Sequence, residues 1–371
     1  MTRRFVWLVV SLAICGVVAG ESESSNVLPT ERCGGFFFVQ MAFAADADRI
    51  LSMLLDTGAS HTVIDPDSLE RVSGKRIEAG RRARLPEMTA GEITFRGIQA
   101  SVLSLDHLQL VLGKPLDGIL GFPAFRKVLL TMDYPRAEVR VRFGTLAPPD
   151  GERILRTFKE KRRPVIKLTF GSQQRLVLID SGSFSGFVLN ESRRLRYAAE
   201  PIAFDSSLRI NRVMIRSGAR LLDDVQFATA RMVTPTVVVG KSTNLVGANV
   251  LRHFSVTYDQ KKRRVLFERA DEEPIEFPAV REIGWALRPN EKGFEVLRVF
   301  DGFGASRAGI EPGDLVVAID GTPVYERDLC DHEPETRTQV AVTIERGGRR
   351  IDFDARRRGR VLDHCIRAST S

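Results

Sequence analysis

One short pattern occurs twice in this 371-residue chain and constrains its fold more than any other feature. The first copy is Leu54–Ser60 (LLDTGAS), and the second is Leu178–Ser183 (LIDSGS). In each copy, two apolar residues are followed by an aspartate, a small hydroxyl residue and a glycine. The apolar pair is typical of the end of a buried strand. The glycine permits a sharp turn against a close neighbour, and the hydroxyl can bond to the local backbone. The pattern predicts two carboxylates, Asp56 and Asp180, each on a rigid loop at a strand end.

The surroundings of the two copies repeat as well. Each aspartate follows a predicted β-hairpin and precedes an apolar segment that ends in glycine. Gly121 and Gly247 are 126 positions apart (247 − 121), as are Asp133 and Asp259 (259 − 133), and the two loop aspartates are 124 apart (180 − 56). Three pairs of matching residues separated by nearly the same number of positions indicate an internal duplication. We therefore expect a mainly β chain with two lobes of similar fold.

Composition and turn residues divide the remainder of the chain. With 43% apolar residues, a chain of this length can fill two or three cores. Acidic residues and two prolines mark a linker before a smaller C-terminal unit. The predicted segments are a signal peptide at 1–20, a tether at 21–32, lobe 1 at 33–146, an interlobe connection at 147–163, lobe 2 at 164–268, a linker at 269–281, the C-terminal unit at 282–357 and a basic tail at 358–371.

The first twenty residues have the composition of a secretory signal. A basic start is followed by a short apolar run from Phe5 to Cys15 and then by small residues. The run is short for a membrane span, and no later stretch is apolar enough to be one. We expect a periplasmic or secreted protein. A lipoprotein anchor at Cys15 ranks second, because Ile14 is bulky for that cleavage.

Charge and cysteine content limit the partners. The net charge is +8, but the basic residues form scattered short groups without interleaved aromatic residues, which argues against nucleic acid as a partner. Three cysteines remain after the signal. In an oxidising compartment, Cys330 and Cys365 are expected to form a disulfide, with Cys33 left over. Metal binding by these cysteines and the nearby His332 and His364 is disfavoured, because adjacent residues can seldom both face one ion. We expect no metal and no cofactor.

On these residues, the two halves resemble the lobes of aspartic proteases over roughly residues 33–268. The first loop is similar to the retropepsin-like form, and the second is closer to the pepsin-like form. The resemblance implies two barrel-like β lobes in which the paired aspartates share one proton and activate water for attack on a peptide bond. It implies Asp56 and Asp180 as catalytic residues, Thr57, Gly58, Ala59, Ser181, Gly182 and Ser183 as loop support, and Ile119, Gly121, Val246 and Gly247 as the apolar-glycine motifs behind the loops.

One departure keeps a second interpretation open. Such enzymes close over substrate with a glycine-containing hairpin from the first lobe, whereas Gly74–Gly97 contains no obvious flap sequence. The alternative function is therefore a periplasmic peptide-binding or scaffolding protein whose duplicated barrel no longer cuts.

The C-terminal unit resembles a PDZ domain of the bacterial protease type, a small β/α fold. The resemblance rests on residues 308–324 (AGIEPGDLVVAIDGTPV). It implies a site that receives a protein C-terminus as an added strand, with Gly293, Phe294 and Val296 as candidates. Such a unit can present substrates, control access to the active site, or only pack against the lobes. Because both catalytic lobes lie in one chain, we expect a monomer.

Overall fold

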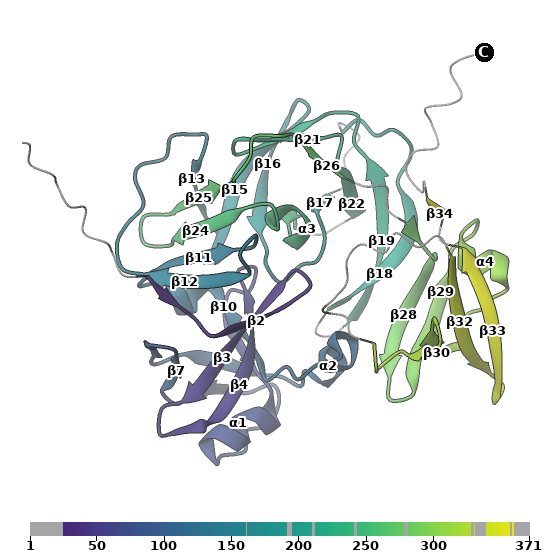
Figure 1. Cartoon of the computed structure of the whole chain (residues 1–371), viewed down its shortest axis with the longest axis horizontal. Coiled ribbons are helices and arrows are strands. Elements are labelled where there is room, and N and C mark those ends of the chain that lie inside the picture. Colours follow the sequence, from purple (N-terminus) through teal and green to yellow (C-terminus); the bar gives the residue numbers. More distant parts are fainter. Residues whose placement is uncertain are drawn as a thin grey trace, which may run out of the picture.

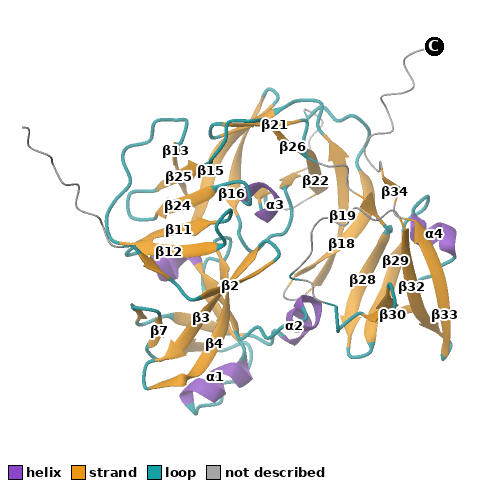
Figure 2. Ribbon diagram, viewed as in Figure 1, coloured by secondary structure: helices purple, strands orange, loops and turns teal. Residues whose placement is uncertain are grey.

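The computed structural model describes residues 25–160, 162–190, 195–209, 212–240, 243–277, 281–327, 330, 339–356 and 358–359. Over these residues the chain is mainly β, with a few short helices (Figure 2), and the predicted fold class is confirmed. The predicted signal peptide lies outside them. Within the described part of the chain, no helix has the length and apolar character needed to cross a bilayer. We keep the names lobe 1, lobe 2 and C-terminal domain for residues 33–146, 164–268 and 282–357.

Lobe 1 is built on a sheet whose centre delivers Asp56. β4 (Asp46–Asp56) pairs with β3 (Phe36–Phe43) as the predicted hairpin, and β10 (Gly118–Gly121) lies parallel to the end of β4. In this register Gly121 is beside Asp56. The other strands are β2 (Thr30–Cys33), β5 (Thr62–Ile64), β6 (Arg82–Arg84), β7 (Met88–Ala90), β8 (Ile93–Phe95) and β9 (Gln99–Val102), in the order β6-β9-β5-β10-β4-β3-β7-β8 with β2 beside β3.

Lobe 2 repeats this arrangement around Asp180. β16 (Gln173–Ile179) pairs with β15 (Arg163–Phe170), and β23 (Leu245–Val246) lies parallel to the end of β16, with Val246 beside Ile179. The other strands are β14 (Phe158–Glu160), β17 (Phe187–Asn190), β18 (Ile202–Arg209), β19 (Arg212–Arg220) and β22 (Thr236–Gly240), in the order β14-β15-β16-β23-β17-β22-β19-β18. The predicted duplication of the lobes is therefore visible in the strand order.

A third sheet joins the two lobes (Figure 1). β11 (Leu129–Asp133) of lobe 1 pairs antiparallel with β24 (Ser255–Asp259) of lobe 2. Thr131 stands opposite Thr257, and their hydroxyl oxygens are 2.8 Å apart. The other strands are β1 (Asn26–Val27), β12 (Glu138–Arg142), β13 (Ile154–Arg156) and β25 (Arg264–Glu268), in the order β1-β12-β11-β24-β25-β13. Each half thus contributes one hairpin to a shared sheet.

The strands that lead to the aspartates are covered on both faces. Leu55 and Ile179, the last apolar residues of β4 and β16, belong to a main core that runs through both lobes. The preceding Leu54 and Leu178 point the other way, because successive side chains of a strand alternate. They lie in two smaller apolar clusters, one in each lobe.

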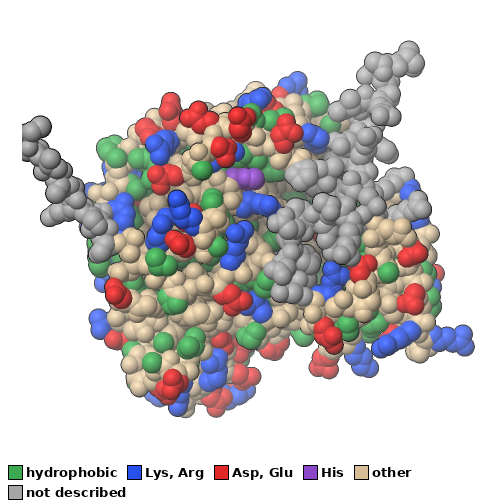
Figure 3. All heavy atoms as spheres, viewed as in Figure 1, with side chains coloured by type: hydrophobic (Ala, Val, Ile, Leu, Met, Phe, Trp, Pro, Cys, Tyr) green, Lys and Arg blue, Asp and Glu red, His purple; other side chains and the backbone are tan. Residues whose placement is uncertain are grey.

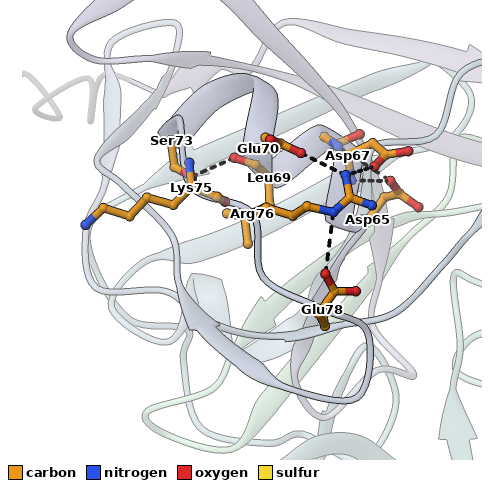
Figure 4. Close-up of polar contacts among 9 residues, drawn as sticks. Asp65, Asp67, Leu69, Glu70, Ser73, Lys75, Arg76 and Glu78 are labelled. Atoms are coloured by element: carbon orange, nitrogen blue, oxygen red, sulfur yellow. Dashed lines mark hydrogen bonds and ion pairs between the residues drawn. The ribbon is translucent and has the colours of Figure 1, made fainter.

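Helix α1 (Pro66–Ser73) follows β5 and is fixed at its start by Asp65. One carboxylate oxygen of Asp65 accepts from Asp67 N (3.0 Å) and Ser68 N (3.4 Å), which satisfies two free N–H groups of the first turn. The other oxygen accepts from Leu105 N (3.1 Å), at the start of α2 (Asp106–Leu112). Arg76 reaches back to carboxylates of α1 and to Glu78 (Figure 4). Asp65 therefore positions two helices on lobe 1.

The C-terminal domain is a six-stranded sheet with its own apolar core. It comprises β28 (Trp285–Asn290), β29 (Gly293–Val299), β30 (Leu315–Ile319), β32 (Gln339–Arg346) and β33 (Arg349–Arg356) in that order, with β31 (Thr322–Pro323) beside β30 and α4 (Gly304–Ala308) packed on β33. β28 is an edge of this sheet and faces β18 and α2 (Figure 1). The smaller elements are the 3-10 helix η1 (Phe122–Phe125), α3 (Ala248–Leu251), β20 (Val225–Phe227), β21 (Ala230–Val233), β26 (Ile275–Glu276), β27 (Arg281–Glu282) and β34 (Arg358–Gly359).

The disulfide differs from the prediction. Cys33, at the end of β2, is bonded to Cys330 of the C-terminal domain. The predicted Cys330–Cys365 pairing is therefore wrong, and Cys365 lies outside the described residues. Cys33 and Cys330 are 297 positions apart. Only the packing of the C-terminal domain against lobe 1 brings them together, and neighbouring sequence carries no signal of that packing.

Candidate active site

Asp56 and Asp180 face each other across the junction of the lobes. A Cβ atom added to Gly58 would lie 2.5 Å from the carboxyl carbon of Asp180, and one added to Gly182 would lie 2.5 Å from that of Asp56. Each carboxyl group therefore rests against the glycine of the opposite loop, in space that a side chain would fill. This contact is the reason that both copies of the pattern need glycine two residues after the aspartate.

The hydroxyl residues of the two loops bond across the same junction. Thr57 N donates to Ser181 Oγ (2.9 Å), and Ser181 N donates to Thr57 Oγ1 (3.0 Å). Thr57 Oγ1 in turn donates to Ile179 O (2.8 Å), and Ser181 Oγ donates to Leu55 O (2.8 Å). Both side chains are buried. The four bonds form a closed, symmetric network that fixes one aspartate relative to the other.

Backbone groups of each loop also hold its own carboxylate. Asp56 Oδ1 accepts from Gly58 N (2.7 Å) and Ala59 N (3.1 Å), and Asp180 Oδ1 accepts from Gly182 N (3.1 Å). Bonds of this kind stabilise the ionised form of a carboxyl group. Ser183 Oγ accepts from Ser185 N at 3.4 Å, a bond within the same loop.

The apolar-glycine motifs pack directly behind the loops. A Cβ atom on Gly121 would lie 2.5 Å from the backbone carbon of His61, and one on Gly247 would lie 2.5 Å from Ser183 O. Phe122 N donates to Ala59 O (3.1 Å), and Gly247 N donates to Gly186 O (2.9 Å). Ile119 and Val246, beside these glycines, are buried. The motifs therefore buttress the loops from which the aspartates project.

Two tyrosines that sequence reasoning did not single out lie in the sheet that joins the lobes. Tyr134 follows β11 and Tyr258 lies in β24, and both are fully buried. Burial raises the pKa of both phenols, and for Tyr134 the neighbouring Tyr258 and Asp180 raise it further. The Thr57 hydroxyl lies near Tyr258 without hydrogen-bond geometry, so neither phenol has a partner among the described residues. Both phenols therefore stay neutral beside the aspartates.

The predicted PDZ candidates lie in an internal strand of the C-terminal domain. Gly293, Phe294 and Val296 lie in β29, which has β28 on one side and β30 on the other. Val296 is fully buried and its N–H donates to Asp314 O (2.8 Å). A Cβ on Gly293 would lie 2.4 Å from Val316 O, so this glycine serves strand packing. An added strand needs a free edge, and β28 is the edge on this side of the sheet.

Two duplicated β lobes with apposed Asp-Thr-Gly and Asp-Ser-Gly loops define an aspartyl-protease-like domain. Residues 45–124 match the family model described as aspartyl protease, a range that contains Asp56 and the Gly118–Gly121 motif. Comparison with curated proteins gave no match. The family match supports a protease, a hydrolase that acts on peptides. Among the described residues, no group of three or more His, Cys, Asp or Glu side chains is placed to hold a metal ion.

Proposed function

We propose that the chain is an exported aspartic endopeptidase that hydrolyses peptide bonds between Asp56 and Asp180. The observation that carries this proposal is the reciprocal contact of each carboxyl group with the opposite glycine. A scaffold without catalytic use has no need to bring two acids together, because their mutual repulsion destabilises the fold unless they share a proton.

The chemistry follows from that shared proton. The ionised aspartate takes a proton from a water molecule held between the two carboxyl groups, and the water oxygen attacks the peptide carbonyl carbon. The protonated aspartate donates to the carbonyl oxygen, which gives a neutral tetrahedral intermediate. Its collapse breaks the C–N bond as the leaving nitrogen is protonated. The two acids titrate as a pair rather than individually.

The proposed compartment and assembly rest on other features. The N-terminal signal composition and the Cys33–Cys330 disulfide support export into an oxidising compartment. Both aspartates come from one chain, which supports a monomer. Basic and acidic side chains are interspersed over the face drawn in Figure 3, in line with polypeptide rather than nucleic acid as the partner.

We also propose that the C-terminal domain is a PDZ-type module. Its six-stranded sheet, its short helix and the run at residues 308–324 support this assignment. The edge strand on this side of the sheet is β28, and an added polypeptide would pair with it in place of the internal β29 candidates. Its partners are polypeptide substrates or protein C-termini.

The test is cleavage of a peptide library by the full exported chain between pH 4 and 8, with and without a pepstatin-type inhibitor. Asp56→Asn and Asp180→Asn keep the shape of each side chain and remove its acid. We expect inhibition by pepstatin and a loss of about 10³-fold in kcat/KM for either variant, with unchanged circular dichroism. Absence of cleavage by the wild type over this pH range would favour the alternative of a peptide-binding scaffold.

A further inference from the structure

An apolar face borders the first catalytic loop. Leu54, Val63 and Ile119 come from the three strands around Asp56 and point away from the main core. They share a cluster with Ala59, which is part of the loop itself. A peptide held between the two aspartates must lay its side chains against the faces beside them. Yet these three residues are only 4–8% exposed, so something in the chain already covers this face.

The C-terminal domain contributes to that cover. Cys330 packs into the same cluster, beside the leucines of α2. Its carbonyl accepts from Gly34 N at 2.8 Å, next to the disulfide with Cys33. A Cβ on Gly113, at the end of α2, would lie 3.2 Å from Arg327 O. Lobe 1 and the C-terminal domain are thus joined by one covalent bond and by close backbone contacts at the edge of the active-site loop.

The same domain also contacts lobe 2. Phe204 of β18 packs with Ala286, Phe300 and Phe303 of the C-terminal domain, and Leu287 N donates to Ser206 Oγ at 3.1 Å. Val238 links this contact to the apolar cluster of Leu178, Val188 and Leu245, the lobe 2 counterpart of the face described above. β28, the strand edge proposed to accept polypeptide, is the element that faces β18 (Figure 1).

We propose that the C-terminal domain is an autoinhibitory latch across both lobes, closed by the Cys33–Cys330 disulfide and opened by its reduction. This inference rests on the proposed peptidase function. The docked domain and a substrate compete for the apolar faces beside the two aspartates. A dithiol supplies two electrons and two protons, the S–S bond breaks, two thiols form, and the dithiol becomes a cyclic disulfide. The C-terminal domain then separates from lobe 1 and keeps only noncovalent contacts, among them those with β18 of lobe 2.

The first experiment measures kcat/KM of the full exported chain for a cleaved peptide, before and after treatment with dithiothreitol. We expect an increase on the order of tenfold on reduction, and the same increase without reductant in Cys33→Ser and in Cys330→Ser. Cys365→Ser retains both partners of the disulfide and should behave as the wild type does. Equal rates in the oxidised and reduced forms, or a fall on reduction, would overturn the latch while leaving the peptidase assignment intact.

A second variant tests the latch through its contact with lobe 2 and leaves both cysteines unchanged. Phe204→Ala removes the ring that packs against the C-terminal domain, and we expect it to raise the rate of the oxidised enzyme. Phe143→Ala is the matched control, because that ring is 71% exposed, and it should leave the rate unchanged. An unchanged rate in Phe204→Ala would count against the latch.

Hydrogen exchange provides a readout that does not need activity. In the Asp56→Asn variant, reduction should speed amide exchange in α2 and in β18 by on the order of tenfold. Unchanged exchange in both segments overturns the latch. If no form of the protein cleaves any peptide, the proposed function fails, and the exchange measurement still decides whether the domain is held by the disulfide.

Discussion

The two lobes are nearly identical at the aspartate loops and differ most in the segment that follows. In both loops a hydroxyl residue bonds across the junction and a glycine accepts the opposite carboxyl group. In lobe 2, 22 to 40 positions after Asp180 (202 − 180 and 220 − 180), the chain forms the long hairpin β18–β19. The corresponding residues of lobe 1, 78 to 96, form the short strands β6, β7 and β8 within the body of the lobe.

This difference shows which parts of a duplicated fold are free to diverge. The proposed sharing of one proton by the two acids needs matched support from both sides, which accounts for the symmetry of the loops. The following segment has no such constraint. In lobe 1 this segment forms strands that complete the sheet of the lobe, whereas in lobe 2 it forms a hairpin that contacts the C-terminal domain. The family match covers residues of lobe 1 alone. The hydrogen bonds and glycine contacts around Asp180 nevertheless repeat those around Asp56.

The largest expected effect comes from breaking the symmetric hydroxyl network. Thr57→Val leaves Ile179 O and Ser181 N without their partner in a buried site, at a cost of about 2–4 kcal/mol in unfolding free energy. Ser181→Ala should cost a similar amount, because its bonds mirror those of Thr57. Urea unfolding at pH 7 measures both.

Thr169→Val is the control for this pair of variants, since it removes an exposed hydroxyl from a strand of lobe 2. It should change the unfolding free energy by less than about 0.5 kcal/mol. A fall in unfolding free energy in only one of Thr57→Val and Ser181→Ala would show that the two loops do not depend equally on the network.

The next effect concerns the reciprocal glycines. Gly58→Ala and Gly182→Ala each place a methyl group where the opposite carboxyl group lies. The end of an aspartate side chain can move aside, so the fold should persist while the acid leaves its position. A displacement of this kind costs about 10²-fold in kcat/KM.

Gly240→Ala in β22 is the matched control, because nothing lies within 4 Å of the added carbon. It should leave kcat/KM unchanged. If only one of Gly58→Ala and Gly182→Ala lowers kcat/KM, the two aspartate side chains differ in their freedom to move. The symmetry of the two loops would then hold for the backbone but not for the carboxyl groups.

Sequence reasoning located the two aspartate loops because their structure is encoded locally. An aspartate after a buried strand, followed by a hydroxyl residue and glycine, encodes its own turn, and the 124-position offset pairs Asp56 with Asp180. The apolar-glycine motifs came from the resemblance to aspartic proteases, and the structure shows that a strand inserted beside the loop needs a glycine at the contact.

The remainder depends on packing between distant elements, for which local sequence carries no pattern. Nothing near Cys33 indicates that Cys330 will lie beside it. Gly293 was a peptide-binding candidate because of the resemblance to PDZ domains, and that resemblance did not indicate that its strand has a neighbour on each side. Likewise, the burial of Tyr134 and Tyr258 beside the aspartates results from the joining of two hairpins into one sheet.

The smallest effect is an acid sensitivity confined to lobe 2. Burial, with the charges of Arg252 and Arg269, lowers the pKa of His253 from 6.5 to about 4. Above pH 6.5 the imidazole is neutral in both the folded and the unfolded states. As the pH falls from 6.5 to 4 the unfolded state takes up the proton first, so the folded state loses stability over this window. His253→Gln should therefore flatten the decline.

The matched position in lobe 1 is Lys127 (253 − 126), an exposed residue without an imidazole. Lys127→Gln should leave the slope of stability against pH unchanged, whereas His253→Gln should move the acid midpoint down by about a few tenths of a pH unit, because solvent screens a half-buried imidazole. Urea unfolding at half-unit steps from pH 7 to 4 compares the two. Equal slopes in wild type and His253→Gln would mean that acid sensitivity arises from groups common to both lobes, with the paired aspartates the first to examine.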